Sequence, residues 1–237
     1  MTRNLTFTAC AILLVVAATN APATDDITVV YGRGRAELMR TTLEAQRHLE
    51  SGDLPGARRL LDAVIQSDAT FYPAYFIRAE VSLQQRRFAD AAQDCDNALR
   101  QDSTFAEAAL LRAKANYYLG RYAASLREIE HIISIRPRQD AYARAYGERA
   151  WLRLNCPDAT FRDTQQAIKD ATTSCKLSEW RNEDMIDTLA LAYAKAGDFD
   201  SAIRYEQRAL GAKDLSSDEM RELQHNLAAY KQHRLPQ

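Results

Sequence analysis

Small residues recur at a fixed interval of 34 positions, and this period constrains the fold more than any other feature of the chain. Two series of small residues keep the interval without drift: Ala45, Ala79, Ala113 and Gly147, and Ala57, Ala91 and Ser125. Self-similarity at a period of about 20–50 residues is typical of stacked repeats. One such repeat cannot bury both of its apolar faces alone, so we expect the repeats to stack on one another.

Each period predicts two helices joined by a short turn. Within residues 76–83 the apolar positions recur at helical spacing. Similar turn sequences occupy residues 51–54, 85–88, 119–122 and 196–199. In three of them an aromatic residue (Phe88, Tyr122 or Phe199) is expected to cap the hairpin by packing between its two helices. The chain has 40 alanines but only 8 glycines and 6 prolines. This composition favours helices and short turns over a sandwich or a barrel.

The period and its small and aromatic positions resemble the tetratricopeptide repeat. The resemblance implies an all-α fold, a right-handed α-solenoid of helix-turn-helix repeats. It places five repeats at residues 38–71, 72–105, 106–139, 140–182 and 183–216. An N-terminal lead-in over residues 24–37 and a capping helix and tail over residues 217–237 complete the expected organisation. Ser216 or Ser217 is the expected N-cap of that last helix, whose apolar face carries Met220, Leu223, Leu227 and Tyr230.

The first 23 residues have the pattern of a secretory signal peptide. Arg3 supplies a positive charge, residues 5–18 form an uncharged and mostly apolar run, and residues 21–23 match a small-x-small cleavage site. That run is shorter than the ~20 apolar residues that span a bilayer. Cleavage is therefore favoured over a membrane anchor, and Cys10 lies too early in the run for lipid attachment. We expect an exported protein, periplasmic or extracellular, without a membrane segment after cleavage.

The fourth repeat is longer than the others, since Ala190 follows Gly147 after 43 residues. The additional residues lie near positions 155–163, where Pro157 ends one helix and Asp163 with Gln166 predicts a capping box for the next. The sequence here resembles a subtype of exported bacterial tetratricopeptide-repeat proteins with a CPD…RD insertion. We favour a structural loop, in which Phe161 covers a core edge and Arg162 pairs with an acid, over a partner-contacting insertion.

Three cysteines remain after signal cleavage, Cys95, Cys156 and Cys175. An odd number cannot be fully paired within one chain. A disulfide between Cys156 and Cys175 would have to bridge a helix that separates them by ~18 Å. Buried free thiols are therefore the favoured interpretation.

The sequence contains residue types that can act in catalysis, but they do not occur at the spacings of known catalytic or metal-binding motifs. The four histidines, His48, His131, His225 and His233, have no zinc-ligand spacing. The chain contains neither a phosphate-binding glycine loop nor a G-x-S-x-G elbow. We expect no enzyme, no cofactor and no metal site; an enzyme or small-molecule binder would need groups converging from different repeats.

The charge balance argues against nucleic acid as a partner. Signal cleavage removes Arg3 and leaves 30 basic against 32 acidic residues. The two arginines of residues 31–35 are interpreted as part of a flexible basic lead-in. Arg78 and Arg112, one period apart, are interpreted as forming ion pairs between repeats, with acids such as Asp62 or Asp94, rather than a basic binding ladder.

The resemblance assigns partner binding to the first helix of each repeat, which lines the concave face in this family. Carried over to this chain, it predicts a partner-binding groove of Phe76, Glu80, Leu110, Lys114, Tyr117, Tyr118, Arg144, Glu148, Trp151, Asp187 and Lys195. Tyr117, Tyr118 and Trp151 are the expected anchors, and the charged residues of the groove would hold opposite charges of the partner. The alternative is that Tyr117 and Trp151 pack between neighbouring helices.

These features together predict a non-catalytic scaffold for a protein or peptide segment, acting outside the cytoplasm. The alternative function is structural: self-association through the ends of the solenoid or through an unpaired thiol, which would give a homo-oligomer. The sequence does not name the partner.

Overall fold

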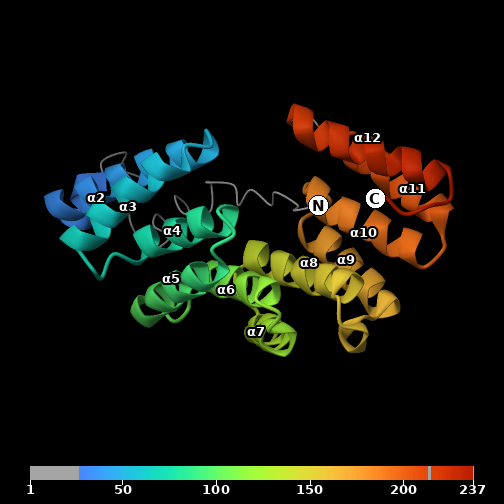
Figure 1. Ribbon diagram of the computed structural model, residues 1–237, viewed down its shortest axis with the longest axis horizontal. Helices are drawn as coiled ribbons and strands as arrows, with labels where there is room; N and C mark the ends of the chain where they lie inside the picture. Colours follow the sequence, from blue (N-terminus) through green and yellow to red (C-terminus); the bar gives the residue numbers. More distant parts are fainter. Residues whose placement is uncertain (1–26, 213–214, 237) are drawn as a thin grey trace. The chain divides into compact units, whose positions relative to one another are not determined.

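Every regular element in the computed structural model, which describes residues 27–212 and 215–236, is a helix. The chain divides into two compact units, the first ending at Leu119 and the second beginning at Gly120. The first contains α2 (Ile27–Glu50), α3 (Leu54–Ser67), α4 (Tyr72–Gln84), α5 (Phe88–Gln101) and α6 (Ala106–Tyr118) (Figure 1). The second contains α7 (Tyr122–Ile135), α8 (Gln139–Asn155), the short η1 (Ala159–Phe161), α9 (Thr164–Leu177), α10 (Glu183–Lys195), α11 (Phe199–Ala209) and α12 (Ser217–Lys231).

The expected lead-in is wrong over most of its length. Helix α2 begins at Ile27, so residues 27–37 are helical and continuous with the first predicted repeat. The signal-peptide prediction falls on residues 1–23, which lie outside the described residues. The third predicted repeat is divided between the two units, because α6 belongs to the first and α7 to the second.

The hairpin turns share one backbone feature. Gly52, Gly120 and Gly197 have φ values of 82°, 75° and 85°, and Arg86 occupies the equivalent position with a φ of 60°. This left-handed region is open to glycine and costs other residues about 1–2 kcal/mol. The turn at Arg86 is therefore the strained one of the four.

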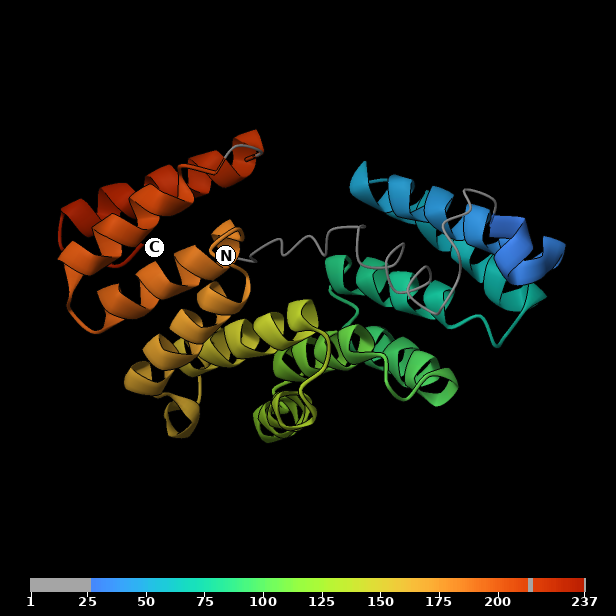
Figure 2. The ribbon, with the colours of Figure 1, turned by 180° about the vertical axis from the view of Figure 1, so that it is seen from behind.

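In the first unit, consecutive helices pack side by side as antiparallel pairs, α2 with α3 and α4 with α5 (Figures 1 and 2). The periodic small residues Ala45, Ala57, Ala79 and Ala91 are fully buried at these contacts. Phe71 and Phe105 close the core where α4 and α6 begin. The small positions therefore do what the period predicts: they let helix backbones approach closely.

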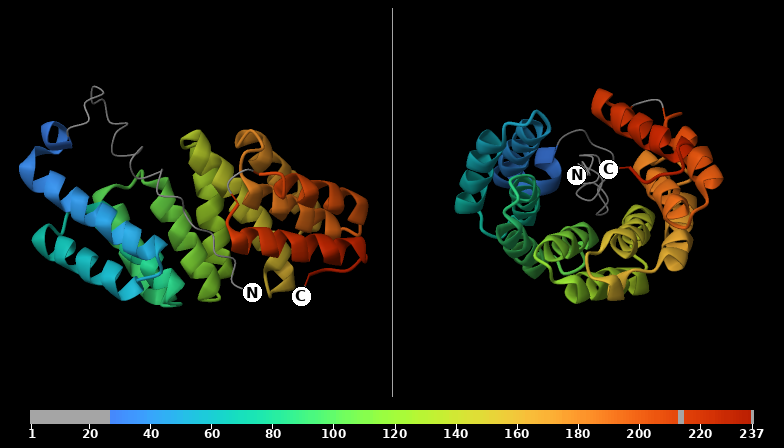
Figure 3. Two further views of the ribbon diagram at one scale, coloured as in Figure 1. Left: turned by 90° about the horizontal axis from the view of Figure 1, so that it is seen from above. Right: turned by 45° about the vertical axis from the view of Figure 1, so that its right-hand side comes forward.

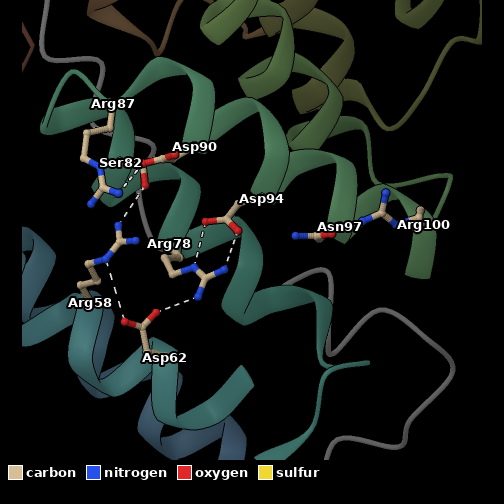
Figure 4. Close-up of polar contacts among 9 residues, drawn as sticks. All are labelled: Arg58, Asp62, Arg78, Ser82, Arg87, Asp90, Asp94, Asn97 and Arg100. Atoms are coloured by element: carbon tan, nitrogen blue, oxygen red, sulfur yellow. Dashed lines mark hydrogen bonds and ion pairs between the residues drawn. The ribbon is translucent and has the colours of Figure 1, made fainter. Parts of the chain in front are cut away.

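Arg78 ties three helices of the first unit together (Figure 4). From α4 it donates to Asp94 of α5 through Nε and Nη2, at 2.9 and 2.6 Å, and to Asp62 of α3 through Nη1, at 2.7 Å. These ion pairs raise the pKa of the Arg78 guanidinium, with the Asp94 hydrogen bond as the largest cause. Arg112 likewise pairs with Asp96 at 2.5 Å. The Arg78–Asp62 and Arg112–Asp96 ion pairs each join two repeats. They confirm that these arginines form ion pairs between repeats rather than a basic binding ladder.

In the second unit, α8 and α9 pack most closely at Gly147. A Cβ atom at this position would lie 3.1 Å from the Ser174 hydroxyl, which donates to the Ala143 carbonyl at 2.7 Å. Arg149 of α8 forms a two-bond ion pair with Asp170 of α9, at 2.8 Å for each bond. Figure 3 shows α10 and α11, in orange, as a further antiparallel pair of this unit.

The insertion after α8 is a short, capped loop. Phe161 of η1 is half-buried, with its ring centroid 6.0 Å from that of Tyr122. Asp163 caps α9 by accepting from the Gln166 amide at 2.9 Å, as predicted, but the Gln166 side chain donates to Asp170 instead of closing the box. Arg162 is exposed, and, after the Thr160 hydrogen bonds, its positive charge contributes to lowering the pKa of Asp158, the acid that caps η1, although the two side chains form no direct ion pair.

The last helix covers the end of the second unit. Ser216 and Glu219 form a complete capping box at its start. Leu223 and Tyr230 are buried, whereas Met220, predicted on the same face, is 42% exposed. Within the described part of the chain, Cys95, Cys156 and Cys175 are buried free thiols, as favoured from the sequence.

Candidate functional site

The predicted partner-binding residues lie on the first helix of four hairpins, α4 and α6 in the first unit and α8 and α10 in the second. Three are buried, Phe76, Glu80 and Leu110, at 3%, 8% and 1% exposure. The other eight are half-buried: Lys114, Tyr117, Tyr118, Arg144, Glu148, Trp151, Asp187 and Lys195. A half-buried side chain keeps some surface for a partner, so the candidate site in each unit rests on these eight. Their role in binding stays a prediction.

Two aromatic residues of the first unit have packing contacts of their own. The ring centroids of Phe76 and Phe105 lie 4.9 Å apart, which places Phe76 in the core beside the start of α6. Tyr118 stacks on Phe88, with centroids 4.7 Å apart and planes at 15°. Tyr117 meets the edge of Tyr118 at 5.4 Å. Tyr117 on α6 of the first unit and Trp151 on α8 of the second occupy the same register one period apart in the sequence.

Two charged residues of the second unit are engaged by the chain itself. Asp187 accepts from the Asn226 amide of α12 at 3.1 Å. The Lys195 ammonium donates to the Leu154 carbonyl of α8 at 2.7 Å. Burial lowers the pKa of Lys195, and the neighbouring charge of Arg162 lowers it further. The charged candidates of α10 are thus positioned by fixed hydrogen bonds.

An aromatic stack in the second unit was not predicted. Trp180 and Tyr205 lie parallel with centroids 5.9 Å apart, and Tyr205 and Tyr193 at 5.4 Å. The Arg208 guanidinium lies 4.1 Å from the centre of the Trp180 ring. Glu179 and Trp180 both have positive φ, 53° and 61°, and this turn directs the indole into the stack. The residues come from a turn and two helices, so no local pattern in the sequence identifies them.

Among the described residues, no group of three histidine, cysteine or acidic side chains is arranged to hold a metal ion. Within the same residues, no helix has the length and apolar character to span a membrane.

The helices and their turns define an α-solenoid of helix-turn-helix repeats. A family model described as tetratricopeptide repeat matches residues 42–104. No curated protein matches the sequence.

Solved structures agree with this class. A thermophilic tetratricopeptide-repeat protein of Thermus thermophilus matches with a TM-score of 0.69 and 14% identity, over 82% of this chain and 99% of that one. PilF of Pseudomonas aeruginosa matches with a TM-score of 0.64 and 16% identity, over 84% and 90%. A tetratricopeptide-repeat protein of Parabacteroides merdae matches with a TM-score of 0.64 and 17% identity, over 82% and 71%. These structures share with the chain the fold of an α-solenoid of helix-turn-helix repeats.

Proposed function

We propose that the chain is a non-catalytic interaction scaffold that holds a segment of a partner protein along the first helices of its repeats. The observation that carries the proposal is that each unit has half-buried aromatic and charged side chains on its first helices, on α6 in the first unit and on α8 and α10 in the second. Half-buried aromatics give large contact area with a polar edge and dominate binding energy at protein interfaces. Charged neighbours add selectivity for the partner.

We place this activity outside the cytoplasm. The support is the sequence of residues 1–23, with its positive start, apolar run and cleavage pattern. A catalytic role lacks comparable support in the sequence, which contains neither a phosphate-binding glycine loop nor a G-x-S-x-G elbow.

The test is crosslinking capture in the native host with a double variant, Tyr117→Ala with Trp151→Ala. The full chain, with its own leader, is crosslinked in place, and captured proteins are identified by mass spectrometry. We expect a partner captured by the wild type to be lost from the variant. Tyr142→Ala, which removes a half-buried tyrosine of α8 outside the candidate set, is the control and should capture normally. A partner retained by the double variant with its helical content intact would refute the proposal.

Self-association is the competing function, and the structure weakens one of its two routes. The described cysteines are all buried, so they are not available to link two copies. Light scattering at increasing concentration tests the other route, through the ends of the helix stack. A protein that stays monomeric at all concentrations would exclude self-association and favour the scaffold function.

A further inference from the structure

The aromatic stack of the second unit holds an exposed arginine in place. Arg208, in the last turn of α11, lies with its guanidinium carbon 4.1 Å from the centre of the Trp180 ring. Trp180 is itself fixed, because Tyr205 lies parallel to it at 5.9 Å and Tyr193 lies nearly parallel to Tyr205 at 5.4 Å. A guanidinium is attracted to the face of an aromatic ring. The stack therefore fixes the position of a charged group that would otherwise move freely at the surface.

Two other arginines of the described chain lie over an aromatic ring, and both of them also bind acids. Arg78 lies 5.5 Å from the centre of the Tyr75 ring, and Arg149 lies 5.4 Å from that of Tyr146. Each donates two hydrogen bonds to one buried carboxylate. The Arg208 guanidinium differs, because it forms no ion pair and donates no hydrogen bond to a described residue. Its N–H donors are therefore available to a ligand.

The titratable groups around Arg208 do not neutralise it. Glu179, in the turn before α10, pairs with Arg181. Glu206 of α11 is fully buried, whereas Arg208 is exposed. The charge of Arg208 reaches the Cys175 thiol, but burial raises the pKa of this thiol to about 12, so the thiol is neutral and is no counter-ion. The positive charge of Arg208 is left to solvent or to a ligand.

The turn that presents Trp180 differs from the corresponding links of the first unit. In those links the aromatic residues, Phe71 and Phe105, are buried in the core at 5% and 4% exposure. In the link between α9 and α10, Glu179 and Trp180 have φ values of 53° and 61°, and the indole is only half-buried. Positive φ is costly for residues other than glycine. A cation in the last turn of α11 would stabilise the helix dipole without this turn or the indole, so a dipole role alone does not explain the arrangement.

A guanidinium in a fixed position with free N–H groups is suited to bind a carboxylate. The two groups can form two parallel hydrogen bonds, and one positive charge balances one carboxylate. A phosphate group carries about two negative charges at neutral pH and would be balanced only in part.

We propose that the Arg208–Trp180 site, the guanidinium of Arg208 held on the Trp180 ring, binds an acidic side chain of the partner segment, an inference that rests on the proposed function. The site belongs to α11 and to the turn before α10. It lies outside the candidate residues of the first helices, so it gives the second unit a separate point of contact with the partner.

The first measurement places a probe at the site. The sequence has two tryptophans, so the full chain with Trp151→Phe reports the fluorescence of Trp180 alone. A blocked peptide of four glutamates is titrated into this variant, with a peptide of four glutamines as the comparison. We expect a saturable change in fluorescence with tetraglutamate and none with tetraglutamine.

The second measurement compares affinities for labelled tetraglutamate by fluorescence anisotropy. We expect Arg208→Gln and Arg208→Lys each to weaken binding about tenfold, because neither side chain has the two-donor fork of a guanidinium. Arg204→Gln is the matched control and should leave binding unchanged: Arg204 is exposed one turn earlier on the same helix, and its guanidinium donates to the Ser201 hydroxyl at 2.8 Å. Circular dichroism checks that each variant keeps its helices.

Four results would overturn the site: no binding of tetraglutamate, equal binding of tetraglutamine, equal weakening by Arg204→Gln, or binding that leaves the Trp180 fluorescence unchanged. Stronger competition by inorganic phosphate than by unlabelled tetraglutamate would overturn the carboxylate in favour of a phosphate ligand. The capture experiment separates this inference from the proposed function. A partner lost from the Tyr117 and Trp151 double variant but retained by Arg208→Gln refutes the Arg208–Trp180 site alone, whereas a partner retained by all variants refutes the scaffold.

Discussion

Arg78 binds carboxylates from two other helices, and one of them, Asp94, has a side chain only 7% exposed. Arg78→Gln leaves that charge buried without its main partner. We expect the free energy of unfolding to fall by about 2–3 kcal/mol, measured by urea denaturation. Arg40→Gln is the control, because the Arg40–Glu37 pair is exposed on both sides and should cost about 0.5 kcal/mol or less. Equal losses in the two variants would contradict this account.

Burial raises the pKa of the Cys175 thiol to about 12. Since only the thiolate is alkylated, the folded protein should label at Cys175 roughly 1000-fold more slowly at pH 8.5 than the same protein in urea. Mass spectrometry of the labelled peptides follows Cys175 separately from the other cysteines. Similar labelling rates in both conditions would show that the thiol is accessible in the folded state.

At the scale of single elements, several helices begin at an aspartate whose pKa is lowered by the cap. For α11, the Ser201 hydroxyl and amide hold the pKa of Asp198 below its ordinary value of 3.8. A lowered folded-state pKa means that the cap stabilises the fold above pH 3.8 and that this contribution is lost as the pH falls further. Asp198→Asn keeps an N-cap acceptor that does not titrate. We expect its thermal midpoint to fall less than that of wild type between about pH 5 and pH 3, with exposed Asp200→Asn as the control.

The turn between α4 and α5 offers a stabilising substitution. Arg86 has the positive φ that glycine provides in three equivalent turns. Arg86→Gly removes this strain but also increases the conformational entropy of the unfolded chain. We expect strain relief to be the larger effect, so that the free energy of unfolding rises by about 0.5–1 kcal/mol. Chemical denaturation should show this increase. Gly197→Ala, the opposite change at the equivalent position, should lower stability by about 1–2 kcal/mol.

Most helices were predictable because the 34-residue period fixes both the buried small positions and the turns. The start of α2 was not. Gly32 and Gly34 suggested a flexible segment, but each glycine costs a helix only about 1 kcal/mol, and extending a helix that is already nucleated adds a hydrogen bond per residue. The Arg149–Asp170 pair was missed for a different reason: the insertion in the fourth repeat shifts the register, so no residue at the 34-residue interval leads to it.

At the scale of the whole molecule, stability should depend on neighbouring repeats rather than on one shared core. A chain ending at residue 216 lacks α12 and exposes the cluster of Ala190, Ala194 and Ala202 that Tyr230 covers. We expect hydrogen exchange to show protection falling at least about tenfold in α10 and α11 but not in α3–α5. Equal loss of protection in both units would indicate that they unfold together.

The candidate surfaces were predictable only as far as helix register allows. A resemblance places side chains on the first helices, yet it does not show which of them the chain itself engages. The contact of Lys195 with Leu154 joins residues 41 positions apart, and the Asp187–Asn226 bond joins residues 39 apart. Neither separation is a repeat period, so both contacts depend on the three-dimensional packing.

The packing of each helix against its neighbours in the chain has a consequence for how the protein is made. Contacts that are local in sequence form quickly. A hairpin such as α2–α3 therefore has its principal partners as soon as α4 has followed it, long before synthesis of the whole chain is complete. The opposite holds at the other end. The apolar surface of α10 and α11 stays uncovered until Tyr230 arrives, so the last helix sets the moment at which the nascent chain stops being prone to aggregate.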